Sequence, residues 1–114
     1  MTLKVKISEK QGVSIVQMSG VINSLSIDDL SISFNNVKKA GNVNILLVMK
    51  KIKFMNSSGA GAILSLAKWA GRMGGVVKIA EVPKKIMEIF KLMRLDEIIE
   101  FYSSLSDGLA SFKS

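Results

Sequence analysis

Residues 44–73 read NILLVMKKIKFMNSSGAGAILSLAKWAGRM and contain the clearest structural pattern in the chain. The stretch opens with a continuous apolar run, which is typical of a strand buried on both faces of a parallel sheet. Its second half predicts a helix, and the apolar side of that helix is formed by Ile63, Leu66, Ala67 and Ala70. Because parallel strands are joined by crossover helices, the pattern predicts a strand–turn–helix step of an α/β fold. The serine-rich turn falls at the carboxyl end of the strand, where such sheets place their sites.

The part of the chain before this stretch predicts a hairpin and a helix. Residues 3–7 and 13–19 alternate apolar and polar side chains, which is typical of strands with one exposed face. The short Gln-Gly turn between them favours an antiparallel pair, and Gly20 is expected to end the second strand. A helix is then expected from its cap residue, Ser26, to Gly41.

The part of the chain after the stretch predicts a further strand–helix step and a short C-terminal end. We expect a strand at residues 76–82, a helix that begins at Pro83, a last short strand at 97–102 and a terminal helix within 103–112. The predicted fold is a single α/β domain over residues 1–114. Its sheet is expected to be five-stranded and mainly parallel, with an antiparallel N-terminal edge strand and about four helices.

The composition excludes several classes of function. The chain contains no His and no Cys, so it cannot build a Ser-His-Asp triad, a Cys-His pair or the usual zinc sites. Its nine acidic residues include no D-x-D cluster of the kind that binds calcium or magnesium. We therefore expect a protein that is not an enzyme and that needs no metal and no cofactor.

The cellular location is predicted from the apolar segments. The longest apolar run, residues 44–49, is far shorter than the roughly 18 residues of a membrane helix. The N-terminus alternates like a strand and lacks the pattern of a signal peptide. The absence of Cys agrees with a reducing compartment, so a cytoplasmic location is expected.

Positive charge is concentrated in the middle of the chain. The formal net charge is +7, and between Asp29 and Glu81 there are eight basic residues and no acidic one. An ordinary solvated surface is one explanation, and an acidic partner, an anionic membrane surface or nucleic acid are others. Direct binding to nucleic acid is not expected, because aromatic residues form only 6% of the chain and do not alternate with basic ones.

Two kinds of catalytic or nucleotide-binding loop are excluded for the serine-rich turn. A P-loop needs a Lys directly after its last glycine, but Gly61 is followed by Ala62. A nucleophile elbow needs a glycine two residues before the serine, and neither Ser57 nor Ser58 has one.

Two interpretations of the turn remain open at this point. In the first, Asn56 or Ser57 caps the following helix, while Gly59 and Gly61 allow a tight turn or close packing. In the second, one of the serines is phosphorylated. A phosphate at a helix N-terminus meets free N–H groups and the positive end of the helix dipole. It adds about −1.5 to −2 charges, which a partner docked over the turn would encounter.

Residues 51–64, KIKFMNSSGAGAIL, resemble the signature of the STAS domain, the fold of bacterial anti-sigma factor antagonists. That family typically carries F/Y-x-D-S-S-G-x-G-x-L after an apolar strand. The resemblance extends over nearly the whole chain. GVIN at 20–23 is similar to an early G-x-L-D pattern, Gly74-Gly75 to a central glycine pair, and residues 82–102 to the C-terminal pattern of the family.

The resemblance implies regulation by partner switching. An antagonist of this family binds an anti-sigma factor, which is also a serine kinase, and so frees a sigma factor. The kinase phosphorylates the first serine of S-S-G, which corresponds to Ser57, and a serine phosphatase resets the cycle. The resemblance and the exposed side of the following helix together imply a partner-binding surface made of Asn23, Met55, Asn56, Ser57, Ser58, Gly59, Gly61, Lys68, Trp69 and Arg72.

Two positions depart from the family pattern and favour an alternative. Asn23 and Asn56 stand where the family carries Asp, so two negative charges are missing from the face that a kinase would recognise. The alternative is a STAS scaffold that is not phosphorylated, or an accessory subunit of a membrane transport complex. The basic middle of the chain also favours this alternative, and only here is contact with a membrane expected.

Overall fold

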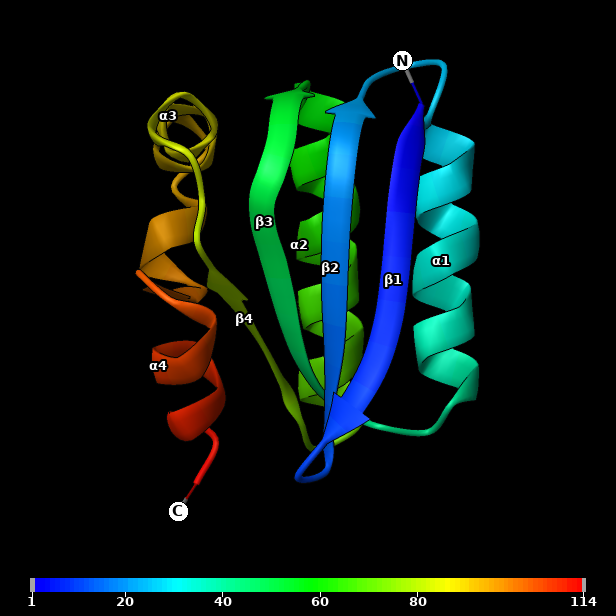
Figure 1. The fold of residues 1–114 in the computed structure, drawn as a ribbon, viewed down its shortest axis with the longest axis vertical. Coiled ribbons are helices and arrows are strands. Elements are labelled where there is room, and N and C mark those ends of the chain that lie inside the picture. Colours follow the sequence, from blue (N-terminus) through cyan, green and yellow to red (C-terminus); the bar gives the residue numbers. More distant parts are fainter. Residues whose placement is uncertain (1, 114) are drawn as a thin grey trace.

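The computed structural model, which describes residues 2–113, places the apolar strand β3 (Asn44–Met55) in the middle of the sheet. β3 pairs in parallel with β2 (Val13–Ile22) on one side and with β4 (Val76–Ala80) on the other (Figure 1). Residues 45–49 of β3 are all buried, because both faces of the strand are covered at this level. The continuous apolar run reflects this burial on two sides.

The two edge strands complete the sheet. β1 (Leu3–Lys10) runs antiparallel to β2, and β5 (Glu100–Tyr102) runs parallel to β4. The strand order is β1-β2-β3-β4-β5. The prediction of a mainly parallel five-stranded sheet with an antiparallel N-terminal edge strand is confirmed.

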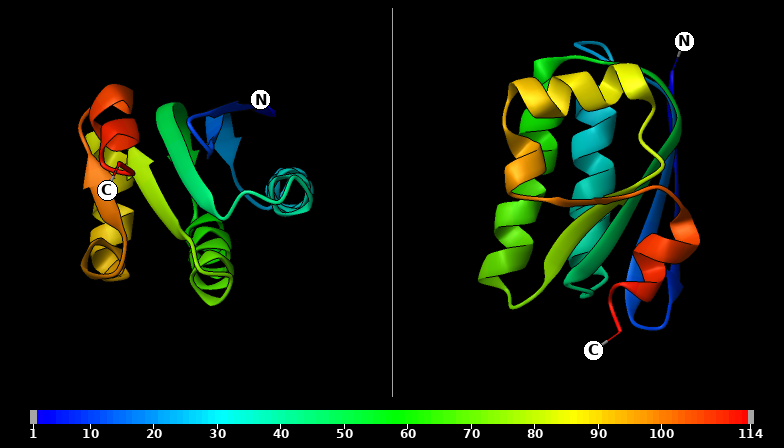
Figure 2. Two further views of the ribbon diagram at one scale, coloured as in Figure 1. Left: turned by 90° about the horizontal axis from the view of Figure 1, so that it is seen from below. Right: turned by 90° about the vertical axis from the view of Figure 1, so that its left-hand side faces the viewer.

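Helices cover the two faces of the sheet unequally. α1 (Ile27–Lys39), α2 (Ser57–Arg72) and α3 (Lys84–Leu92) pack on one face, and α4 (Leu105–Ala110) lies alone on the other (Figure 2). A short 3-10 helix, η1 (Leu95–Glu97), connects α3 to β5. The main core lies under the three long helices, and a smaller apolar cluster lies under α4. Part of the second face therefore remains exposed to solvent.

Several predicted strand boundaries are wrong, and among them β1 continues to Lys10 and β4 ends at Ala80. β2 does not end at Gly20 but continues to Ile22. Gly20 has φ +109°, and a Cβ there would overlap the carbonyl oxygen of Thr2, so only glycine lets the start of β1 approach this closely. Residues 97–102 are not one strand, because the 3-10 turn occupies the first of them and pairing with β4 begins at Glu100.

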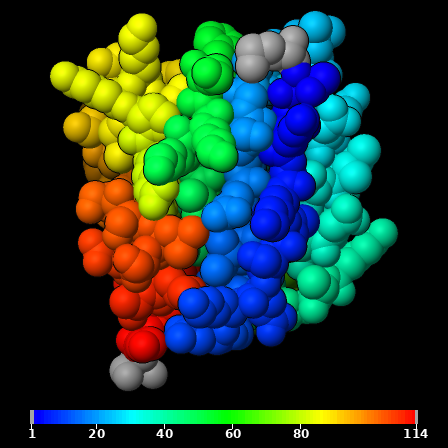
Figure 3. Space-filling view, viewed as in Figure 1, coloured from blue at the N-terminus to red at the C-terminus, as the bar shows by residue number. Residues whose placement is uncertain are grey.

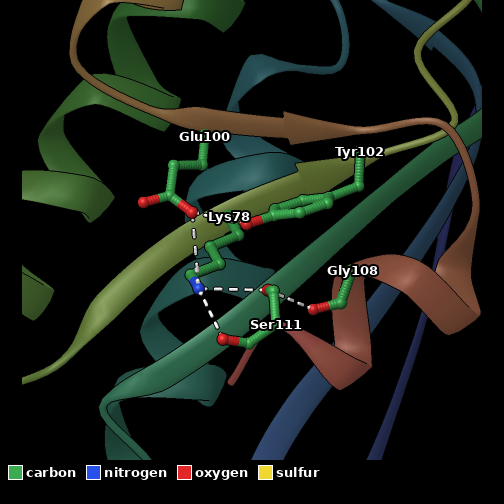
Figure 4. Close-up of polar contacts among 5 residues, drawn as sticks. All are labelled: Lys78, Glu100, Tyr102, Gly108 and Ser111. Atoms are coloured by element: carbon green, nitrogen blue, oxygen red, sulfur yellow. Dashed lines mark hydrogen bonds and ion pairs between the residues drawn. The ribbon is translucent and has the colours of Figure 1, made fainter. Parts of the chain in front are cut away.

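A buried lysine holds the C-terminal segment against the sheet (Figure 4). Lys78 on β4 is only 8% exposed, and its Nζ donates to the backbone oxygen and the Oγ of Ser111, both at 3.0 Å. The Nζ lies 3.5 Å from Glu100 Oε1 and 4.7 Å from the centre of the Phe112 ring. A hydrogen bond from Tyr102, together with the charge of Lys78, lowers the pKa of Glu100 from its usual value. The Lys78 charge thus stabilises the fold and is not displayed to a partner.

Candidate functional site

The serine-rich turn lies where β3 ends and α2 begins. Asn56 has an extended backbone, with φ −90° and ψ 176°, and its Oδ1 accepts a hydrogen bond of 3.0 Å from the N–H of Gly59. This is an N-cap, so of the two capping candidates the structure selects Asn56. Ser57 and Ser58 are the first two residues of the helix, and both are exposed.

The ends of β2 and β3 are tied together at this point. The backbone N–H of Asn56 donates to the carbonyl oxygen of Ile22 at 3.0 Å. Asn23 follows Ile22 directly, so the two asparagines that depart from the family pattern lie at the same edge of the sheet. The sequence prediction placed both in one surface, and the topology brings them to the same end of neighbouring strands.

The loop that contains Asn23 is fixed by its own polar side chains. Asn23 Oδ1 accepts from the N–H of Leu25 at 2.9 Å. Ser26 Oγ donates to the carbonyl oxygen of Val21 at 2.6 Å and accepts from the N–H of Asn23 at 3.0 Å. Ser26 occupies the cap position of α1, but the predicted side-chain cap is wrong, because these loop bonds use its hydroxyl. The loop holds Leu25 outward, with 90% of the residue exposed.

Two predicted site residues support the turn from below. Met55 is 0% exposed, so its side chain cannot contact a partner, and its place in the predicted binding surface is corrected to a packing role. Gly59 is also buried, and a Cβ there would lie 2.5 Å from Ile22 Cγ2 and 2.8 Å from Met55 Cγ. The start of α2 therefore packs closely on the strand ends. Gly61 differs, because the space around its Cβ position is open.

The remaining predicted residues follow α2 away from the turn. Lys68 and Arg72 are exposed. Trp69 is half-buried toward α1, where Lys38 Nζ lies 5.7 Å from the centre of its ring. This arrangement makes Lys68 and Arg72 available to a partner, whereas Trp69 also packs between the two helices.

The sequence analysis missed two exposed apolar residues beside the turn. Phe54 is 50% exposed and Leu25 is 90% exposed. A signal for Phe54 was present, because the spacing of core residues changes from two to three in Met49, Ile52 and Met55. A spacing of three in a strand marks a bulge, which exposes one residue more than simple alternation does. Both residues lie toward the carboxyl ends of β2 and β3, where a partner could cover them.

The chemistry available at the turn is that of an exposed hydroxyl at a positive helix end. The first turn of α2 contains no acidic side chain. Within residues 2–113, no group of three or more His, Cys, Asp or Glu residues is placed to hold a metal ion. None of the helices described by the structure is both long enough and apolar enough to span a membrane. The exposed serines of the turn can therefore contact a partner or carry a modification.

Comparison with known proteins assigns the family. The profile of the STAS domain matches residues 4–108. The chain belongs to the STAS domain family. This confirms the resemblance drawn from the serine-rich turn and its surroundings.

Individual STAS proteins agree with this assignment. The chain is 25% identical to the anti-sigma F factor antagonist of Paenibacillus polymyxa over 114 residues, covering 99% of this chain and 97% of the relative. It is 22% identical to the anti-sigma-B factor antagonist of Bacillus subtilis, with 95% and 97% covered. A crystal structure of an anti-sigma factor antagonist from Mycobacterium paratuberculosis has the same fold, with a TM-score of 0.90, 19% identity, and 98% and 95% covered. STAS proteins of this kind are binding regulators, and the chain is not an enzyme.

The cap of α2 yields a first testable prediction. Asn56→Ala is expected to lower the free energy of unfolding by about 1 kcal/mol, because the N–H of Gly59 loses its acceptor. Asn56→Asp keeps an acceptor and places negative charge at the helix N-terminus, so its stability should equal or exceed that of the wild type. Urea unfolding followed by circular dichroism measures both. Asn35→Ala removes an exposed amide from α1 and is the control. An equal loss in Asn35→Ala and Asn56→Ala would contradict the cap.

Proposed function

We propose that this STAS protein is an anti-sigma factor antagonist whose binding is controlled by phosphorylation of Ser57. The observation that carries the proposal is the exposed S-S-G turn at the start of α2, held by the Asn56 cap. The curated relatives named as antagonists of anti-sigma factors support the general role. In this proposal residues 1–114 act as one domain, in the cytoplasm, where ATP and sigma factors are found.

The proposed partner is an anti-sigma factor that is also a serine kinase. It would dock over the end of β3 and the exposed side of α2. Leu25 and Phe54 would supply apolar anchors beside the turn, and Lys68 and Arg72 would supply polar contacts along the helix. Occupying the anti-sigma factor in this way would release its sigma factor.

Phosphorylation would end the complex by adding charge at the centre of the docking surface. A phosphate on Ser57 brings about −1.5 to −2 charges. The exposed hydroxyl can carry it without disturbing the core, and the first-turn N–H groups of α2 can stabilise it. The change would therefore act on the partner and not on the fold. A serine phosphatase would restore the binding form.

Phosphosite mapping tests this proposal. The protein is purified from its native cells with phosphatases blocked, after growth and after stress, and its intact mass is measured. We expect one phosphate, located at Ser57. Ser57→Ala should abolish it, and Ser58→Ala, which changes the neighbouring exposed hydroxyl, should retain it. Absence of phosphate under every condition would contradict the switch.

The two asparagines and the basic charge favour one alternative function. Asn23 and Asn56 replace the family Asp residues, and each uses its side-chain oxygen for a local hydrogen bond that needs no negative charge. The alternative is a constitutive scaffold without phosphorylation, or an accessory subunit of a membrane transport complex. A protein that carries no phosphate but binds anionic vesicles would favour it.

A further inference from the structure

Beside α4, the side chains of β1, β2 and β3 form an exposed part of the second sheet face (Figure 3). α4 covers this face only over the cluster of Val13, Ile15, Leu46, Val48, Ala80 and Leu109. Beside that cluster, two depressions of about 650 and 410 Å³ lie over β1, β2 and β3. Lysines line both of them. We call the set Lys4, Lys6, Lys50, Lys51 and Lys53 the lysine groove.

Strand pairing places these lysines side by side. Lys4 on β1 pairs with Ser19 on β2, and Ser19 pairs with Lys51 on β3. One register line across three strands therefore carries two lysines with a neutral hydroxyl between them. Lys6 lies two residues along β1 from Lys4, which corresponds to about 7 Å on the same face.

Irregular pairing between β2 and β3 explains why so many lysines lie outside the core. Met49, Ile52 and Met55 are buried, and two register shifts interrupt the pairing alongside them. Two residues, not one, are exposed in each interval, so the intervals contribute Lys50 and Lys51 first and Lys53 with Phe54 next. Bulges of this kind re-aim side chains and are often found at functional surfaces.

The positive charge of the lysine groove is not neutralised within residues 2–113. Among residues 2–113, the single ion pair joins Lys78 to Glu100, and neither residue lines the groove. The one carboxylate that lines a depression belongs to Glu81, and its Oε2 accepts from the N–H of Leu105 at 2.7 Å. Glu81 is held by the start of α4 and keeps its negative charge, so the lining has five lysines against one carboxylate. Five lysines on one concave surface attract an anionic partner.

We propose that the lysine groove binds an acidic segment of a partner protein in extended conformation. Side chains on one face of an extended chain repeat about every 7 Å, which matches the spacing of Lys4 and Lys6. Ser19 and Gln17, which also line the groove, can hydrogen-bond to a peptide backbone. The groove lies on the sheet face opposite α2, and Ser57 is not among the residues that line it.

Two other anionic partners fit the lysine groove less well. Nucleic acid binding uses aromatic side chains on which bases stack, and none of the described residues that line the two depressions is aromatic. Membrane-surface binding uses apolar side chains that enter the lipid, but the apolar lining residues Met18, Val48 and Ile52 are all buried. An acidic peptide requires neither feature.

The test measures fluorescence anisotropy of a labelled short peptide of alternating Glu and Thr with the full chain at low salt. The double variant Lys4→Gln/Lys51→Gln is expected to weaken peptide binding about fivefold, because each exposed ion pair contributes only modestly to the free energy of binding. Lys84→Gln/Lys85→Gln removes the same charge from the exposed start of α3 and should change binding less than about twofold. Circular dichroism confirms that both variants are folded.

Several outcomes would overturn the proposal. If the wild type does not bind the peptide at low salt, the groove is not a binding site for acidic segments. Equal weakening by the two double variants would indicate general charge attraction. Single-stranded DNA, or vesicles of phosphatidylcholine and phosphatidylglycerol, could bind more tightly than the peptide and lose binding in Lys4→Gln/Lys51→Gln. That result would assign the groove to nucleic acid or lipid. None of these measurements involves Ser57, so the phosphorylation proposal stands or falls separately.

Discussion

Replacing Gly75 with Ala is expected to lower the free energy of unfolding by about 3 kcal/mol. A Cβ at Gly75 would overlap the carbonyl group of Val43, which is backbone and cannot rotate away. That carbonyl oxygen accepts from the N–H of Val76 at 3.0 Å, and the N–H of Gly75 donates to Ala70 at 2.8 Å. Room for the methyl group requires the start of β4 to move away from β3. Such a movement would loosen the parallel pairing at the centre of the sheet.

Two neighbouring glycines provide controls for this result in urea unfolding. Gly71 is in α2 with open space around its Cβ position, so Gly71→Ala should raise stability by up to about 1 kcal/mol through helix propensity. Gly74 has φ +88° and also has open space, so Gly74→Ala should cost about 1 kcal/mol from backbone strain alone. The steric explanation is rejected if Gly75→Ala is no more destabilising than Gly74→Ala.

The central architecture was predictable because local and long-range requirements agree there. The apolar run of β3 is buried on both faces, and the stripe on α2 packs on that same sheet. A cap at Asn56 or Ser57 was predictable, because the strand ends and the helix begins within one turn, and the structure selects Asn56. Ser57 follows directly from that position, since the first residue after a cap lies at the exposed start of the helix.

Features that depend on distant segments were not predictable from local pattern. Gly20 looked like the end of a strand, but its role is to let Thr2 approach, and no local signal records that contact. Lys78 lies within a predicted strand, and no local signal indicates that the chain returns with Ser111 to bury it. Each of these depends on tertiary contacts.

Ser57→Asp is expected to weaken binding of the kinase partner at least tenfold, and Ser57→Ala should keep the affinity within about threefold. The partner is first purified by its phosphotransfer to this protein, and the dissociation constants are then measured by calorimetry. The new charge would lie within the proposed docking surface, at the exposed start of α2. Asp carries less charge than phosphate, so true phosphorylation should weaken binding further.

The stability of Ser57→Asp separates this effect from unfolding. A carboxylate at the first position of α2 interacts favourably with the helix dipole, so the variant should be at least as stable as the wild type. Ser106→Asp places the same charge on α4, across the sheet, and should leave the affinity unchanged. Equal affinities for Ser57→Asp and Ser57→Ala would reject the switch, because the turn would then bind its partner regardless of charge. Loss of binding in Ser106→Asp as well would indicate that the affinity depends on the net charge of the protein and not on the turn.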